Sequence, residues 1–101
     1  MRLTQHQIEI LKSTANEIFG SESRLLLFGS RIDDSLNGGD IDLYVDGFNC
    51  SVEQRLAAKL RFLVQVKRQI GEQRIDLVFS PLPKEPVLPI HQIAEKTGIP
   101  L

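Results

Sequence analysis

The stretch that decides the fold runs from residue 28 to residue 45 and joins two apolar segments through a polar loop. It reads Phe28-Gly29-Ser30, then a loop of nine residues that begins with Arg31, then Asp40-Ile41-Asp42-Leu43-Tyr44-Val45. Asp40 and Asp42 are two residues apart, so on an extended strand both carboxylates point to one face. The apolar residues that alternate with them point to the other face, which indicates a strand that is core on one side and binds something positively charged on the other.

Two chemical features of this stretch point to nucleotides. Carboxylate oxygens on one face of a strand are typical ligands of Mg²⁺ or Mn²⁺. A Gly29-Ser30 turn after the apolar run 25–28 offers backbone N–H groups on which a triphosphate can rest. A metal ion and a triphosphate together indicate nucleotide chemistry. The simpler interpretation is a strand, a turn and a hairpin whose aspartates are solvated.

A third carboxylate, Asp76, lies inside the apolar run Ile75-Asp76-Leu77-Val78-Phe79. A carboxylate in the middle of an apolar strand needs a partner. The partner is either Arg74, on the same face of its own strand, or a metal ion shared with Asp40 and Asp42. A divalent cation would remove the repulsion among three neighbouring carboxylates, but the residues alone leave both interpretations open.

Together, Gly29-Ser30-Arg31 and Asp40-Ile41-Asp42 resemble the signature of the nucleotidyltransferase superfamily that includes DNA polymerase beta, and most of all its minimal nucleotidyltransferase branch. The resemblance extends through Asp76, which fits the place of the family's third acid on the strand after the long helix. The resemblance therefore favours the metal interpretation of Asp76 over an ion pair with Arg74. The loop after Ser30 is one residue shorter than in many relatives. The resemblance implies a site made of three metal-binding and catalytic acids and three residues against the phosphates: Asp40, Asp42 and Asp76, and Gly29, Ser30 and Arg31.

The same resemblance implies the activity and the partner. The expected reaction is transfer of a nucleoside monophosphate, AMP in particular, from ATP or another nucleoside triphosphate to a hydroxyl group. The expected acceptor is a small helical HEPN-type toxin, for which the chain would act as antitoxin. The alternative is a non-catalytic module that binds a nucleotide or neutralises a partner by contact. A small-molecule nucleotidyltransferase is less favoured, because such enzymes usually carry an extra helical domain.

Composition sets limits on these functions. The chain has 101 residues, 42% of them hydrophobic and 25% charged, which fits one globular domain spanning residues 1–101. A net charge of −1 argues against direct nucleic-acid binding and against attraction to an anionic membrane. A lone cysteine, Cys50, and the lack of a long apolar run predict a cytoplasmic protein.

The pattern of apolar residues predicts seven elements in an α/β (α+β) order. Capping boxes at Thr4-x-x-Gln7 and Ser51-x-x-Gln54 mark two helix starts. The predicted order is α-β-α-β-α-β-α, with helices at 4–19, 30–36, 51–70 and 90–96 and strands at 24–28, 40–45 and 74–79. This predicts a two-layer domain with a small mixed sheet flanked by helices, and the resemblance implies the nucleotidyltransferase fold.

The long predicted helix carries both an apolar stripe and many cations. Leu56, Leu60 and Leu63 share one stripe, with Val52 at its start. The basic residues of the second half are either a solvated face or a surface for an acidic partner or for RNA. No aromatic residues alternate with them to support binding of single strands. These basic residues are Arg55, Lys59, Arg61, Lys67, Arg68 and Arg74.

Overall fold

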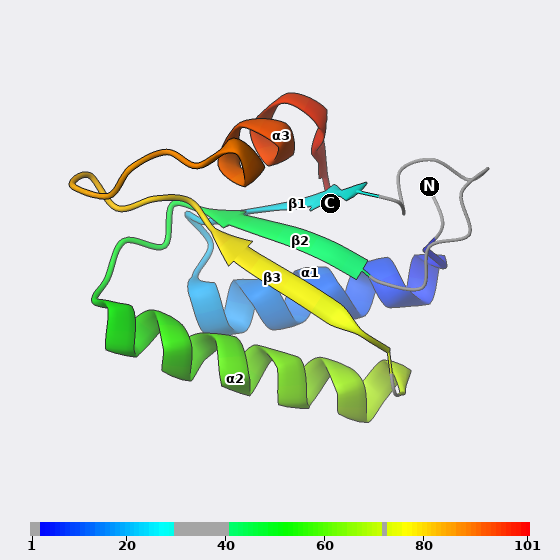
Figure 1. The fold of residues 1–101 in the computed structure, drawn as a ribbon. Coiled ribbons are helices and arrows are strands. Elements are labelled where there is room, and N and C mark those ends of the chain that lie inside the picture. The colour runs from blue at the N-terminus through cyan, green and yellow to red at the C-terminus, as the bar shows by residue number, and fades with distance from the viewer. Residues whose placement is uncertain (1–2, 30–40, 72) are drawn as a thin grey trace.

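The computed structural model describes residues 3–29, 41–71 and 73–101, and within these it contains three helices and a four-stranded mixed sheet. Figure 1 shows their arrangement. The elements in chain order are α1 (Gln5–Phe19), β1 (Arg24–Phe28), β2 (Ile41–Asp46), α2 (Val52–Ile70), β3 (Ile75–Phe79), α3 (Pro89–Thr97) and β4 (Ile99–Pro100).

Both long helices begin where the capping boxes predict. The Gln7 amide donates to Thr4 Oγ1 at 3.0 Å, and the Gln7 side chain accepts from the Thr4 amide at 3.0 Å. Ser51 and Gln54 repeat this reciprocal pair at 3.1 Å in both directions. Each box satisfies two of the backbone N–H groups that a helix start leaves open, which is why the two starts could be placed from sequence.

The sheet has the order β3-β2-β1-β4. β1 is antiparallel to β2 and to β4, whereas β2 and β3 are parallel and are connected through α2. The parallel pair needs a long crossover, and the 19-residue α2 supplies it. The predicted mixed sheet is therefore confirmed.

Helices cover both faces of the sheet (Figure 1). α1 and α2 pack on one face, around a core that includes Leu11, Phe19, Leu43 and Phe62. α3 packs on the other face, where a smaller cluster joins Leu26, Phe28, Tyr44 and Ala94. The predicted two-layer arrangement is wrong in this respect, because a short helix after the proline-rich segment returns to the second face.

The predicted element order also needs correction. Among the described residues the order is α-β-β-α-β-α-β. The helix predicted at 30–36 lies outside the described residues. The last strand, β4, was not predicted: it is two residues long and contains Pro100, yet Leu26 and Leu27 of β1 pair with Pro100 and Ile99. A two-residue strand has no alternation from which it could be recognised.

Only part of the stripe predicted on α2 packs on the core: Leu63 is partly buried against it. Val52, Leu56 and Leu60 are exposed, and the buried side chains are Arg55, Ala58, Phe62 and Val66. Arg55 can be buried because its Nε donates to the carbonyl oxygen of Phe48 at 3.1 Å and its Nη1 to that of Ser80 at 2.7 Å. Its guanidinium also lies over the Phe79 ring, 5.0 Å from the centroid.

No helix in the described part of the chain is both long enough and apolar enough to cross a membrane.

Candidate active site

Gly29 ends β1 and lies directly against the carboxylate of Asp42. Its φ of +81° is in the left-handed region that side chains rarely adopt. A Cβ at this position would overlap with Asp42 Oδ2. Glycine is therefore required here both by the backbone conformation and by the close approach of a carboxylate. The turn predicted to hold phosphates begins beside one of the predicted metal ligands.

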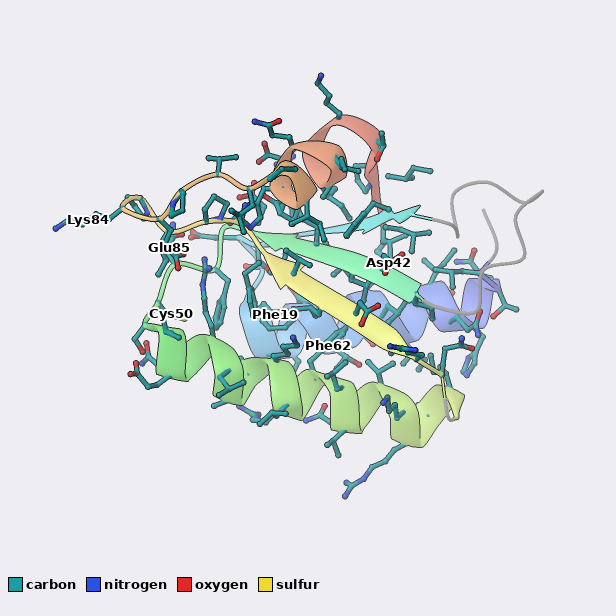
Figure 2. The ribbon with its side chains drawn as sticks, viewed as in Figure 1. Phe19, Asp42, Cys50, Phe62, Lys84 and Glu85 are labelled. Atoms are coloured by element: carbon teal, nitrogen blue, oxygen red, sulfur yellow. The ribbon has the colours of Figure 1, made fainter. Side chains whose placement is uncertain are left out.

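Asp42 and Asp76 are neighbours on adjacent parallel strands. The β2–β3 register pairs Asp42 with Asp76 directly, and the β1–β2 register pairs Phe28 with Asp42. Directly paired residues on neighbouring strands project to the same face, so both carboxylates lie on the face that α3 partly covers. Figure 2 shows Asp42 near the beginning of β2. Asp42 is half-buried and Asp76 is exposed.

The next residues along the same face explain where this open area ends. Tyr44 and Val78 form the adjacent pair in the β2–β3 register, and Tyr44 is fully buried beneath α3. The Tyr44 hydroxyl donates to Glu95 Oε1 of α3 at 3.2 Å. Burial, followed by the charge of Glu95, raises the pKa of Tyr44 to about 12. α3 therefore closes the face at Tyr44 and leaves the row of Asp42 and Asp76 accessible.

A third carboxylate on the same face of β2, Asp46, has a different environment. It pairs in register with Arg24, whose Nε and Nη2 lie 3.2 and 2.6 Å from Asp46 Oδ2. These hydrogen bonds hold the pKa of Asp46 below its ordinary value, against the opposing effect of burial. Asp46 is thus explained by a cross-strand ion pair, and it lies at the other end of β2 from Asp42.

The donor set of the open row fits a hard divalent cation. In-register residues on neighbouring strands are ~5 Å apart, at which two negative charges repel by about 1 kcal/mol in water and about 3 kcal/mol at an effective dielectric of 20. The exposure of Asp76 places this pair toward the smaller value. Two carboxylates brought together by strand register, with a glycine that makes room for one of them, are oxygen ligands of the kind that Mg²⁺ and Mn²⁺ prefer.

The structure brings together three of the six residues predicted for the site: Gly29, Asp42 and Asp76. Ser30, Arg31 and Asp40 lie outside the described residues. Within the described ranges, no three His, Cys, Asp or Glu side chains form a group that could hold a metal ion. The three-acid site therefore remains a prediction. The argument that Asp76 needs a partner because it is buried is wrong, since its side chain is exposed.

Sequence reasoning missed Glu95, which reaches this face from α3 and binds Tyr44. The signal available was Tyr44 itself, two residues after Asp42 and therefore on the same face of the strand. No local pattern links residues 51 positions apart, so the partner of Tyr44 could not be named.

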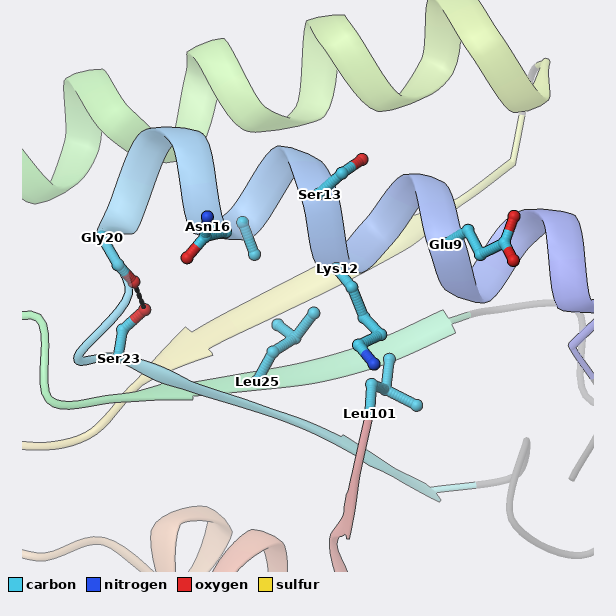
Figure 3. A pocket seen from close by; sticks show the side chains of 9 residues that line it. Glu9, Lys12, Ser13, Asn16, Gly20, Ser23, Leu25 and Leu101 are labelled. Atoms are coloured by element: carbon cyan, nitrogen blue, oxygen red, sulfur yellow. Dashed lines mark hydrogen bonds between the residues drawn. The ribbon is translucent and has the colours of Figure 1, made fainter.

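A pocket of about 550 Å³ lies away from these acids, between α1 and β1 beside the C-terminal Leu101 (Figure 3). Leu25, on its wall, belongs to the sheet face that packs on α1, which is opposite to the face of Asp42. Its charged members, Glu9 and Lys12, are exposed residues of α1. The pocket contains none of the predicted site residues, and we assign it no role.

Comparison with known proteins gives no matching family model and no matching curated protein.

Proposed function

We propose that the chain is a metal-dependent nucleotidyltransferase that transfers a nucleoside monophosphate, AMP in particular, from a nucleoside triphosphate to a hydroxyl acceptor. One observation carries the proposal. Strand register sets the Asp42 and Asp76 carboxylates side by side. The Asp42 carboxylate lies so close to Gly29 that no side chain would fit at position 29.

In this proposal Asp42 and Asp76, together with Asp40, hold Mg²⁺ or Mn²⁺ through carboxylate oxygens. When bound, the metal supplies charge neutralisation for the triphosphate and for the oxygen atoms that enter and leave. The backbone N–H groups of Gly29 and Ser30 hold the terminal phosphates, and Arg31 adds positive charge to them.

The reaction is an in-line displacement at the α-phosphorus. The acceptor oxygen forms the new bond to phosphorus, the bond from the α-phosphorus to the bridging oxygen breaks, and pyrophosphate leaves. Asp76, the most exposed acid of the row, accepts the proton of the attacking hydroxyl.

The acceptor in this proposal is a small helical protein of the HEPN type, and the modification would make the chain its antitoxin. One feature is consistent with a protein acceptor. Asp76 is exposed, so a hydroxyl on another protein can approach it.

The test measures binding and transfer separately. Binding of Mg²⁺ with a non-hydrolysable ATP analogue is followed by calorimetry, and transfer to a HEPN-type protein is followed with ATP labelled at the α-phosphate, together with pyrophosphate release. Asp42→Asn and Asp76→Asn should each lower transfer by about 10²-fold or more, because each removes a charge that acts directly on the metal.

Asp46→Asn is the matched control, because it neutralises a carboxylate on the same face of the same strand that is bound to Arg24 instead. It should leave transfer within a factor of about two. Unchanged transfer in Asp42→Asn would refute the mechanism. Metal-dependent nucleotide binding that depends on Asp42, without transfer to any hydroxyl, would identify a non-catalytic nucleotide-binding module.

A further inference from the structure

The outward side of α2 is an apolar surface that no described element covers. Its side chains Val52, Leu56, Leu60 and Val64 are 62%, 57%, 55% and 50% exposed. They recur every fourth residue, so they form one stripe along the helix. The stripe spans twelve residues and therefore about 18 Å. We call these four residues the α2 stripe.

The α2 stripe is additional to the side of α2 that builds the core. The buried residues Ala58, Phe62 and Val66 already supply the apolar face by which the helix packs on the sheet. A surface helix normally presents one apolar face and one polar face. A second apolar face on the solvent side, continuous over about three turns, is the pattern expected of a helix that packs against two bodies.

The stripe is hollowed at both ends. Near its start, Val52 and Leu56 border a depression of about 210 Å³ whose far wall is Phe79 and Leu82, from the end of β3 and the segment after it. Near its other end, Leu60 and Val64 border a second, shallow depression that is formed by side chains of α2 alone. Large apolar side chains of a partner would enter such depressions and provide the buried anchors on which interface affinity depends.

Charge distinguishes among the occupants that could cover this surface. Apart from the buried Arg55, α2 carries four basic residues, Lys59, Arg61, Lys67 and Arg68, and a single acidic one, Glu53. Lys59 and Glu85 line the first depression, so their charges offset each other there, whereas Arg61 and Arg68 line the second without an acidic residue. A second copy of this chain, docked stripe to stripe, would bring these cations against one another. The repulsion disfavours self-association and favours a partner of the opposite charge.

We infer that the α2 stripe is the docking surface for an amphipathic helix of a partner protein, with apolar residues at three- and four-residue spacing and acidic residues along both edges. The apolar residues enter the two depressions, and the acidic edges meet Lys59 on one side and Arg61 and Arg68 on the other. This inference does not depend on the proposed transferase activity, since Asp42 lies on the opposite face of the sheet.

The test uses a synthetic 16-residue helical peptide with leucines along one face and glutamates on both edges, labelled for fluorescence anisotropy. Its twin has the same leucines but lysines at the edges. The glutamate peptide should bind the full chain at least about tenfold more tightly than the lysine twin, and the difference should shrink at high salt.

Variants of the chain locate the binding surface. Leu56→Glu with Leu60→Glu should weaken the glutamate peptide by about tenfold or more, and Arg61→Glu with Arg68→Glu should reverse the preference between the two peptides. Ile93→Glu, which changes an equally exposed apolar residue on α3, should leave binding unchanged. Because all these residues are exposed, the variants should retain the circular dichroism of the wild type. Asp42→Asn should bind as the wild type does.

Four results would overturn the inference: no binding of the glutamate peptide; equal binding of both peptides; self-association in sedimentation experiments that Leu56→Glu abolishes; or stripe-dependent binding to vesicles of phosphatidylcholine and phosphatidylglycerol or to single-stranded RNA in place of the peptide. Each identifies a different occupant or none.

Discussion

Replacement of Gly29 by alanine tests the link between the end of β1 and the Asp42 carboxylate. Two costs follow from the structure. A side chain at a φ of +81° costs about 1–2 kcal/mol. The new Cβ also overlaps with Asp42 Oδ2, so the Asp42 side chain must leave its rotamer, at a cost of about 0.5–1.5 kcal/mol. The free energy of unfolding should therefore fall by about 1.5–3.5 kcal/mol, as measured by urea denaturation followed by circular dichroism.

A double-mutant cycle separates these two costs. Asp42→Ala removes the carboxylate that the new Cβ meets, so Gly29→Ala should be less destabilising by about 0.5–1.5 kcal/mol in that background. Gly20→Ala is the control. Gly20 also has a positive φ, of +93°, but a Cβ there meets nothing within 4 Å. Its cost should be the same in both backgrounds, within about 0.5 kcal/mol. An identical cost of Gly29→Ala in both backgrounds would refute the overlap with Asp42.

Two further predictions concern pH. Tyr44 is the only tyrosine and the chain has no tryptophan, so absorbance near 295 nm titrates it directly. Its pKa, raised to about 12, means that stability is full below the ordinary value near 10 and falls as pH rises toward 12, by about 2–3 kcal/mol in total. Tyr44→Phe should remove this alkaline loss, and Glu95→Gln should lower the titration midpoint; a midpoint near 10 in the wild type would contradict the buried contact. For Asp46 the sign is opposite: a lowered pKa gives stability that is present above about pH 4 and lost on acidification through the folded-state pKa. Arg24 is largely exposed, so the effect should be below about 1 kcal/mol, and Asp46→Asn should flatten the acid limb of urea midpoints measured from pH 5 to pH 2.

Local sequence predicted the elements well because the signals that set them are local. The capping boxes at Thr4 and Ser51 fixed two helix starts, and alternation fixed β2 within one residue. The register between β2 and β3, by contrast, is not determined by local sequence. It depends on how α2 packs across the sheet, and it decides whether Asp42 and Asp76 are neighbours. The sequence supplied both acids, but only the fold brings them into register.

The sequence did not reveal which side of α2 is buried, because that side contains Arg55. Read as a polar residue, Arg55 interrupts the buried face and makes the stripe through Leu56 and Leu60 look like the more continuous apolar side. In the structure the guanidinium is accommodated by two backbone carbonyl oxygens and the Phe79 ring, so arginine occupies a core position. Those acceptors lie at Phe48 and Ser80, in segments whose proximity to α2 no periodicity reveals.

The proposed docking surface and the proposed active site lie on opposite sides of the sheet. The α2 stripe points away from one face, and the row of Asp42 and Asp76 lies on the other. A helix docked on α2 therefore leaves the acids open. β3 is the outer strand beside β2, so a segment of the docked partner would pass this single edge to bring a hydroxyl to Asp76. If both proposals hold, docking and chemistry are separable. Loss of the stripe should raise the concentration of protein acceptor needed and leave nucleotide binding unchanged, whereas loss of Asp42 should weaken nucleotide binding and leave docking unchanged.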